Sequence, residues 1–154
     1  METDDVTPMV PVGFEPPTGI ATDRYLLEPL GPQHNLSDYD AWTSSMEHIH
    51  ATPGFPDGRW PHEMPLAENL ADLERHARDF ELRKGFTYTV LDPESRAVIG
   101  CLYIYPSKLP GHDADVRLWV RATHAELDQP LWQAVSEWLE RDWPFTSVSA
   151  PGRL

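Results

Sequence analysis

The sequence holds a single cysteine, Cys101, and few basic residues, and both shortages restrict what the protein can be. One cysteine cannot form an internal disulfide or a zinc site built from several thiolates. Lysine and arginine total 12 against 25 aspartates and glutamates, for a formal net charge of −13. Proteins that bind phosphate backbones rely on Lys and Arg. We therefore expect no nucleic-acid partner and no metal ion; the acidity serves solubility or attracts cationic partners such as amines.

Long apolar runs are also missing, and so is glycine over much of the C-terminal part. No stretch approaches the ~20 consecutive apolar residues of a membrane-spanning helix. The N-terminus is acidic and lacks the basic segment and apolar run of a signal peptide. We expect a cytoplasmic protein that does not bind membranes. No glycine occurs between Gly111 and Gly152, so this part contains no glycine-rich loop of the kind that cradles phosphate.

The 154 residues, of which 40% are hydrophobic and 24% charged, are enough for one domain with a core. Residues 1–23 contain five acidic residues, four prolines and no basic residue. This segment is predicted to be an arm that is either disordered or lies along the domain or a partner chain. Residues 24–154 are predicted to form a single domain.

The pattern of apolar residues predicts the order β-α-α-β-β-β-α-β. Period-2 or compact apolar runs predict strands over 25–30, 86–92, 97–105, 114–121 and 145–149. Helical spacing predicts helices near 37–50, 66–84 and 128–142, with Ser37 as the first N-cap and Gly85 as the C-terminal cap of the second. Three consecutive strands between helical segments indicate an α+β domain with a mainly antiparallel mixed sheet covered by helices.

The hairpin over 85–92 and 98–105, with Gly100 after an apolar pair, resembles the core of the GNAT superfamily of acetyl-CoA-dependent N-acetyltransferases. The similarity extends over residues 24–150. It implies a GNAT-like sheet, acetyl-CoA as the cofactor, and transfer of an acetyl group to a small amine or a peptide amine. At the end of the fourth strand it assigns Trp119, Val120 and Arg121 to cofactor binding.

Two features depart from that family pattern. The family follows its fourth strand with a glycine-containing loop that holds the pyrophosphate, whereas this chain continues after Arg121 with Ala-Thr-His-Ala-Glu. Glu126 and Asp128 would repel phosphate, so we expect weak CoA binding with Arg121 as the principal contact. The sequence also ends after the fifth strand, where the family continues with a helix and two strands. The exposed strand edge predicts a homodimer, or cover by the N-terminal arm.

Several side chains are candidates for the chemistry of transfer. Glu47 and His48 lie off the apolar stripe of the first helix and are candidates for a general base, or they form a solvated helix end. Tyr103 and Tyr105 share one face of a central strand, where a tyrosine of a GNAT-like sheet can act as a general acid; otherwise they pack across strands. Cys101 lies mid-strand without a basic neighbour and is predicted to be inert.

The candidate substrate-binding residues lie in a loop and on one strand face. Asp115 and Arg117 alternate with the apolar residues of their strand, and either line a ligand or form a salt-bridged exterior. Trp60, in an aromatic stretch of the loop over 50–65, is a lid over a pocket or packs against another subunit. Two alternatives to acetyl transfer remain: a GNAT-like domain that binds a ligand or a second subunit without acetyl-CoA activity, and a different reaction in the same cleft.

Overall fold

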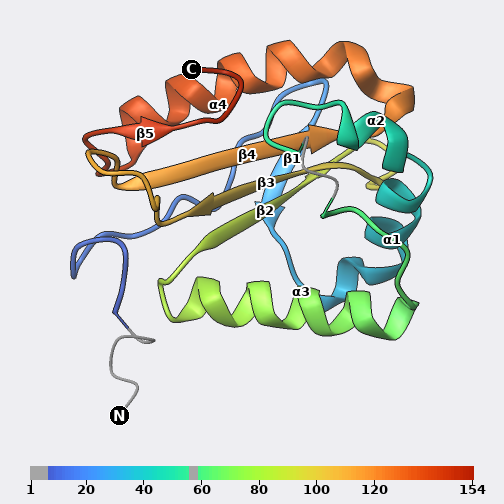
Figure 1. Ribbon diagram of the computed structural model, residues 1–154, viewed down its shortest axis with the longest axis horizontal. Coiled ribbons are helices and arrows are strands. Elements are labelled where there is room, and N and C mark those ends of the chain that lie inside the picture. The colour runs from blue at the N-terminus through green and yellow to red at the C-terminus, as the bar shows by residue number, and fades with distance from the viewer. Residues whose placement is uncertain (1–6, 56–58) are drawn as a thin grey trace.

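The computed structural model describes residues 7–55 and 59–154, which build a five-stranded sheet in the order β1-β2-β3-β4-β5 (Figure 1). The first four strands are antiparallel neighbours and the last pairs with β4 in parallel. Their bounds are β1 (Leu26–Pro29), β2 (Phe86–Leu91), β3 (Val98–Tyr105), β4 (Ala114–Val120) and β5 (Val148–Ser149). The predicted α+β class and mainly antiparallel sheet are confirmed.

Helices cover both faces of this sheet (Figure 1). They are η2 (Pro32–His34), α1 (Asn35–Thr43), α2 (Met46–His50), α3 (Leu66–Glu81), η3 (Ala122–Leu127) and α4 (Asp128–Asp142). The long helix α4 lies on one side of the sheet, and α3 lies on the opposite side with α1 and α2. The predicted helices over 66–84 and 128–142 are confirmed, with α3 ending three residues earlier than expected.

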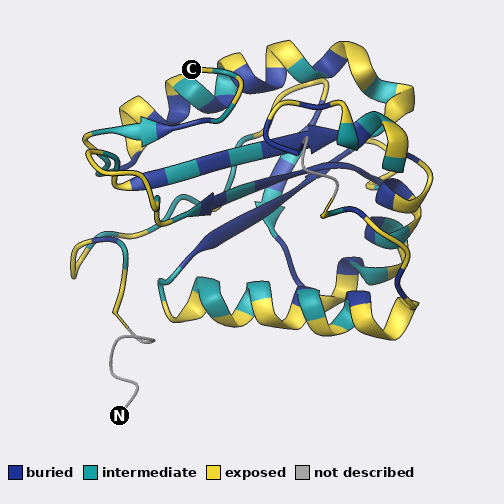
Figure 2. Cartoon of the chain, viewed as in Figure 1, coloured by how far each residue is buried: buried dark blue, intermediate teal, exposed yellow. Residues whose placement is uncertain are grey.

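The core has two parts, one on each face of the sheet. Side chains of β3 and β4 such as Leu102 and Leu118 pack against α4, whereas Cys101 and Trp119 pack against α1 and its neighbours. Trp119 has no exposed surface, so the face of β4 that alternation predicted to be polar is buried at this position, while Asp115 and Arg117 are half-buried. Figure 2 shows the consequence, with the central strands almost entirely buried.

The N-terminal helical region differs from its prediction in its start and in its continuity. Ser37 is not the N-cap, because η2 precedes α1 and the helix already begins at Asn35. The Ser37 hydroxyl instead accepts a hydrogen bond at 2.8 Å from the backbone N–H of Val98, where β3 begins. A break at Ser44 and Ser45 separates α1 from α2, and the Ser45 hydroxyl accepts the N–H of Ala122 at 2.9 Å. Both serine hydroxyls therefore accept hydrogen bonds from the ends of distant elements, and neither caps its own helix.

The predicted cap at Gly85 is also wrong. The residue with positive φ after α3 is Arg83, at 63°, and the helix ends at Glu81. Gly85 is required for a different reason, since a Cβ at this position would overlap the ring of Tyr105. The close approach of β3 therefore explains this glycine.

The described part of the arm, residues 7–23, lies along the domain. The backbone N–H of Leu27 donates to the carbonyl of Ile20 at 2.8 Å, and the Tyr88 hydroxyl donates to the carbonyl of Pro17 at 2.6 Å. Phe14 packs on Trp143 with ring centroids 5.4 Å apart. The arm thus covers the outer edge of β1, not the β5 edge for which a cover was predicted. Residues 1–6 of the predicted arm lie outside the described residues.

Candidate functional site

A cavity of about 260 Å³ lies between α1, α3, the loop after α2 and the sheet. The residues that carry the argument below are Asp38, Trp60, Asp72, His76, Tyr103 and Arg117, all of which line it. Of the predicted site residues, this cavity brings together Trp60, Tyr103 and Arg117. Asp38, Asp72 and His76 were not predicted.

Strand register builds the floor of the cavity. Thr87 of β2 pairs with Tyr103 of β3, which in turn pairs with Arg117 of β4. Side chains at paired positions project from the same face of a sheet, so these three form a row under α3. The Tyr103 hydroxyl accepts a hydrogen bond at 3.0 Å from the Trp119 indole N–H, and burial raises the pKa of Tyr103 well above its usual value.

Aromatic side chains from the loop after α2 form one wall. The Trp60 ring lies 6.4 Å from that of Tyr103 and 5.6 Å from that of Trp42, measured between centroids. Phe55 packs on Trp60 at 5.9 Å. These ring pairs prefer tilted and edge-to-face geometries such as those seen here, and they make the wall apolar.

Asp38, in the first turn of α1, places a buried carboxyl in this apolar setting. The residue is 4% exposed, and Asn69 donates to its Oδ2 at 3.1 Å. Burial raises the pKa of Asp38 to about 6, although the hydrogen bond from Asn69 and the nearby His34 act in the opposite direction. Among the described residues, two cations line the cavity, but Arg75 pairs with Asp72 at 3.6 Å and Arg117 pairs with Asp115. No described residue forms an ion pair with Asp38, so at neutral pH its carboxylate has no paired cation.

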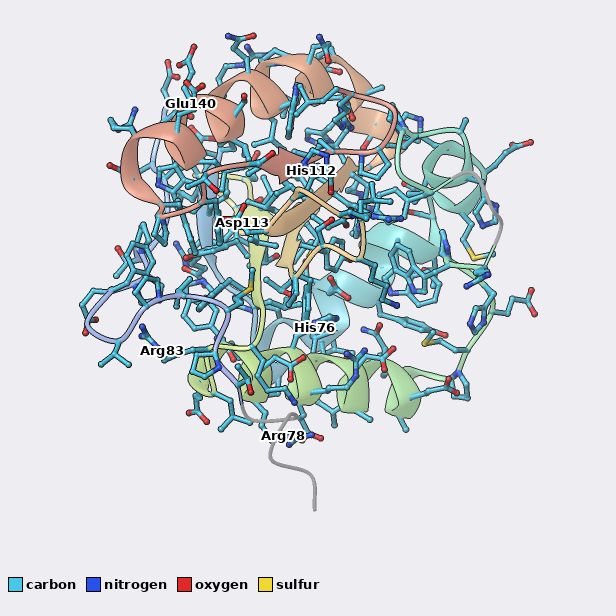
Figure 3. The ribbon with its side chains drawn as sticks, turned by 60° about the vertical axis from the view of Figure 1, so that its left-hand side comes forward. His76, Arg78, Arg83, His112, Asp113 and Glu140 are labelled. Atoms are coloured by element: carbon cyan, nitrogen blue, oxygen red, sulfur yellow. The ribbon has the colours of Figure 1, made fainter. Side chains whose placement is uncertain are left out.

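Helix α3 contributes a polar stripe at helical spacing: Asn69, Asp72, His76 and Asp79. Figure 3 shows His76 rising from α3 toward the sheet, whereas Arg78 points away from it. His76 Nδ1 lies 2.8 Å from the Tyr105 hydroxyl oxygen, and this hydroxyl donates to Asp79 Oδ2 at 2.8 Å.

Burial is the main cause that lowers the pKa of His76 to about 4, with Arg75 acting in the same direction. Burial and the hydrogen bond to Asp79 raise the pKa of Tyr105. At neutral pH the imidazole is therefore neutral and the phenol keeps its proton. The predicted residue Tyr105 reaches the cavity only through His76.

Asp115 and Arg117 form an ion pair at 2.8 Å, and the Arg117 guanidinium also donates to the carbonyl of Gly54 at 2.8 Å. Arg117 lines the cavity, and Asp115, near the start of β4, does not. The pair therefore ties the loop after α2 to the sheet at the rim of the cavity. Its predicted role in substrate binding stays a prediction.

The predicted base, Glu47 or His48, lies elsewhere. Both residues are in α2, and neither lines the cavity. Glu47 is exposed, and His48 Nε2 is buried without a hydrogen-bond partner among the described residues. The structure thus does not bring these two side chains together with Tyr103 and Tyr105, and their catalytic role stays a prediction.

The predicted cofactor-binding residues are engaged in contacts within the domain. Trp119 and Val120 are fully buried. Arg121 pairs with Asp40 at 3.0 Å and donates to the carbonyl of Val98 at 3.3 Å. These contacts direct the guanidinium of Arg121 toward α1 and β3, and its predicted contact with phosphate stays a prediction.

The segment between β4 and α4 forms the 3-10 helix η3 instead of an open glycine loop. The backbone N–H of His124 donates to the carbonyl of Arg121, and that of Asp128 donates to Ala125. These donors are therefore committed before α4 begins, and an anion at this helix start would meet Asp128 in the first turn.

The chain's own C-terminal turn fills the opening between β4 and β5. The two strands pair only at Ala114 and Asp115 of β4 and separate beyond them. In the gap, the guanidinium of Arg153 binds Asp128 at 2.8 and 2.9 Å and donates to the carbonyl of Leu118 at 3.4 Å. The Arg153 side chain is 4% exposed. In this conformation Arg153 occupies the opening between the two strands, and the backbone N–H groups of His124 and Asp128 beside it already have acceptors. The residues around the opening therefore do not fit acetyl-CoA.

Within residues 7–55 and 59–154, no three His, Cys, Asp or Glu side chains are grouped so that they could hold a metal ion. No helix in the same residues has the length and hydropathy needed to cross a membrane.

No protein-family model matches the sequence, and no curated protein matches it. Solved structures do match. A putative ribosomal-protein-serine acetyltransferase from Vibrio cholerae superposes with a TM-score of 0.63 at 12% identity over 83% of this chain and 70% of its own. A ribosomal-protein-S5-alanine acetyltransferase from Vibrio fischeri gives 0.62 at 10% identity over 80% and 67%.

Two further structures bear on the fold. A putative GNAT-family acetyltransferase from Bordetella pertussis has a TM-score of 0.58 at 20% identity, covering 81% of this chain and 74% of its own. The microcin C7 self-immunity acetyltransferase MccE, solved in complex with acetyl-CoA and AMP, gives 0.60 at 11% identity over 81% and 66%. The chain therefore has the fold of the GNAT superfamily, as its sequence pattern predicted, and at these identities the likeness concerns the fold.

Proposed function

We propose that this acetyltransferase-like protein binds a small amine in the cavity between α1, α3 and the sheet. The observation that carries the proposal is the buried carboxylate of Asp38, which faces the cavity without a cationic partner among the described residues. An unpaired buried charge is costly. A bound ammonium group supplies the missing counter-charge.

The other groups of the cavity are consistent with such a ligand. Asp72 adds a second carboxylate, although it pairs with Arg75 at 3.6 Å. The rings of Trp60 and Tyr103 offer π-faces that attract cations and cover an apolar body. A volume of about 260 Å³ is just below the ~300–1,000 Å³ of typical ligand sites. The ligand is thus a small amine with an apolar or aromatic body.

Calorimetric titration tests this proposal with phenethylamine as the probe and 2-phenylethanol as its uncharged analogue. We expect wild-type protein at pH 7.5 to bind the amine and not the alcohol, and Asp38→Asn to bind the amine at least tenfold more weakly, since a charge-assisted contact is lost. Asp40→Asn is the matched control, because Asp40 lies on the same helix but its side chain is 71% exposed and pairs with Arg121 outside the cavity. Equal affinity for wild-type protein and Asp38→Asn would refute the proposal.

Acetyl transfer to the bound amine is a second candidate function. The fold shared with acetyltransferases favours it, and so does the separation of β4 from β5 beyond Asp115. The obstacle is the C-terminal turn held by Arg153 and Asp128.

Calorimetry with acetyl-CoA on wild-type protein and Arg153→Ala tests this second candidate. Binding by wild-type protein, together with thiol release when phenethylamine is added, would support acetyl transfer. If neither protein binds acetyl-CoA while phenethylamine still binds, the chain is a ligand-binding domain with this fold.

A further inference from the structure

The two nitrogens of His76 are in different surroundings. Nδ1 faces the sheet, with the Tyr105 oxygen at 2.8 Å and Thr87 Oγ1 at 3.2 Å. No described group forms a hydrogen bond with Nε2, and the residue lines the cavity. Nε2 is therefore the ring nitrogen that remains for a ligand.

The hydrogen bond between Tyr105 and Asp79 decides which ring nitrogen carries the proton. A carboxylate can only accept, so the Tyr105 hydroxyl uses its single proton on Asp79 Oδ2, at 2.8 Å. Its oxygen can then only accept from His76 Nδ1. A neutral imidazole has one N–H, and if Nδ1 carries it, Nε2 has a free lone pair.

We propose that Asp79 and Tyr105 hold His76 as the Nδ1–H tautomer, so that its Nε2 accepts a hydrogen bond from an N–H of the ligand in the cavity. The part that concerns the ligand rests on the proposed function. Tyr105 and Asp79 are positioning residues, because they act through His76 and not on the ligand.

This arrangement narrows the class of amine. His76 Nε2 and the carboxylates of Asp38 and Asp72 are all acceptors on the cavity wall. A primary ammonium group has three N–H donors to offer them, whereas a quaternary ammonium group has the charge but no donor. The site is therefore specific for an amine that bears N–H groups, and not for any small cation.

The lowered pKa of His76 agrees with this role, since a protonated ring would have no lone pair to offer and would repel the ligand. Arg75, Asp72 and Asp79 are the charged groups that act on this ring. The imidazole therefore stays neutral above about pH 4, which includes the pH of 7.5 at which the amine is charged and binding is measured.

The tautomer can be measured directly by nitrogen-15 NMR, because protonated and unprotonated ring nitrogens have widely separated shifts. We expect the wild-type spectrum to show His76 protonated on Nδ1. Tyr105→Phe removes the acceptor and should move the population toward the Nε2–H form, whereas Glu81→Gln, an exposed carboxylate change on the same helix, should leave it unchanged. A wild-type spectrum in which His76 is protonated on Nε2 would by itself overturn the proposal.

Affinity provides the second readout, with phenethylamine and its N,N,N-trimethyl derivative as probes. We expect Tyr105→Phe to weaken phenethylamine binding about tenfold or more and to leave binding of the trimethyl derivative unchanged. An equal loss of affinity for both probes would show that Tyr105 has a merely structural role. It would also overturn the proposed specificity for amines that bear N–H groups. Failure of phenethylamine to bind wild-type protein would refute the proposed function, while the NMR spectrum alone decides the tautomer.

Discussion

Replacing Asp38 by Asn should make the protein more stable at neutral pH while it abolishes tight amine binding. The carboxylate is buried without a paired cation, so folding has to remove an ionised group from water. Asparagine has nearly the same shape and keeps an oxygen to accept the hydrogen bond from Asn69. The substitution thus removes the buried charge and retains the packing.

The magnitude follows from the pKa. A value raised from 3.8 to about 6, at about 1.4 kcal/mol for each pKa unit, corresponds to about 3 kcal/mol. The carboxylate of Asp38 also lies in the first turn of α1, and losing its favourable interaction with the helix start costs about 0.3–1 kcal/mol. We therefore expect Asp38→Asn to raise the free energy of unfolding by about 2–3 kcal/mol at pH 7.5.

The sign of the pH dependence is fixed by the same shift. Because the folded-state pKa is raised, the penalty from Asp38 is fully present above about pH 6. As the pH falls from about 6 to 3.8, the folded protein takes up the proton first and the penalty disappears. The neighbouring groups His34, Asp72, Cys101 and Tyr103 are the same in both proteins and largely cancel in the difference.

Urea unfolding followed by tryptophan fluorescence at pH 7.5, 6, 5 and 4 measures this difference. Asp40→Asn serves as the control, with only the small change expected from loss of its solvent-exposed ion pair with Arg121. An Asp38→Asn protein that is less stable than wild type at pH 7.5, or a difference that stays constant down to pH 4, would refute the reasoning.

Four further outcomes follow from the structure. Both proteins should lose stability between pH 6.5 and 4 through the lowered pKa of His76, but only in wild type does proton uptake by Asp38 offset part of this loss, so Asp38→Asn should fall more steeply; the same urea series measures it. Gly85→Ala should lower the free energy of unfolding by about 1–3 kcal/mol through overlap with the Tyr105 ring, measured by thermal unfolding. Arg153→Ala should cost about 2 kcal/mol or more, since it leaves Asp128 partly buried and unpaired, measured in urea. Light scattering at micromolar concentration should show the homodimer predicted from the exposed strand edge, and a monomer would contradict it.

The sheet and the long helices could be predicted because their signals are local. The alternation in β4 and the apolar spacing in α3 and α4 mark these elements within single windows of sequence. The break between α1 and α2 could not be read in the same way. It depends on Ser45, whose hydroxyl accepts a hydrogen bond from Ala122, 77 positions along the chain.

The cavity was only partly predictable. The sequence predicts Trp60 from an aromatic loop, Tyr103 from the resemblance to a GNAT-like sheet and Arg117 from a polar strand face. It does not predict the polar stripe of α3. The apolar residues at helical spacing in that helix, such as Leu66 and Leu73, indicate one buried face, yet Leu66 is 36% exposed and the polar Asn69 only 3%. Burial of a polar stripe depends on partners from α1 and β3, which no window of the helix sequence contains.

The opening between β4 and β5 was also only partly predictable from the sequence. The absence of glycine before α4 is visible in the sequence, and the structure has the 3-10 helix η3 in that segment. The contact between Arg153 and Asp128 was not visible, because the two residues are 25 positions apart and neither position belongs to a motif.

The most direct test of the central claim is an NMR titration of wild-type protein with phenethylamine at pH 7.5. The account predicts saturable shift changes confined to the cavity, at the indole N–H of Trp60 and the ring nitrogens of His76, that disappear in Asp38→Asn and persist in Asp40→Asn. Shift changes that map elsewhere on the domain, or that are the same in Asp38→Asn, would contradict it.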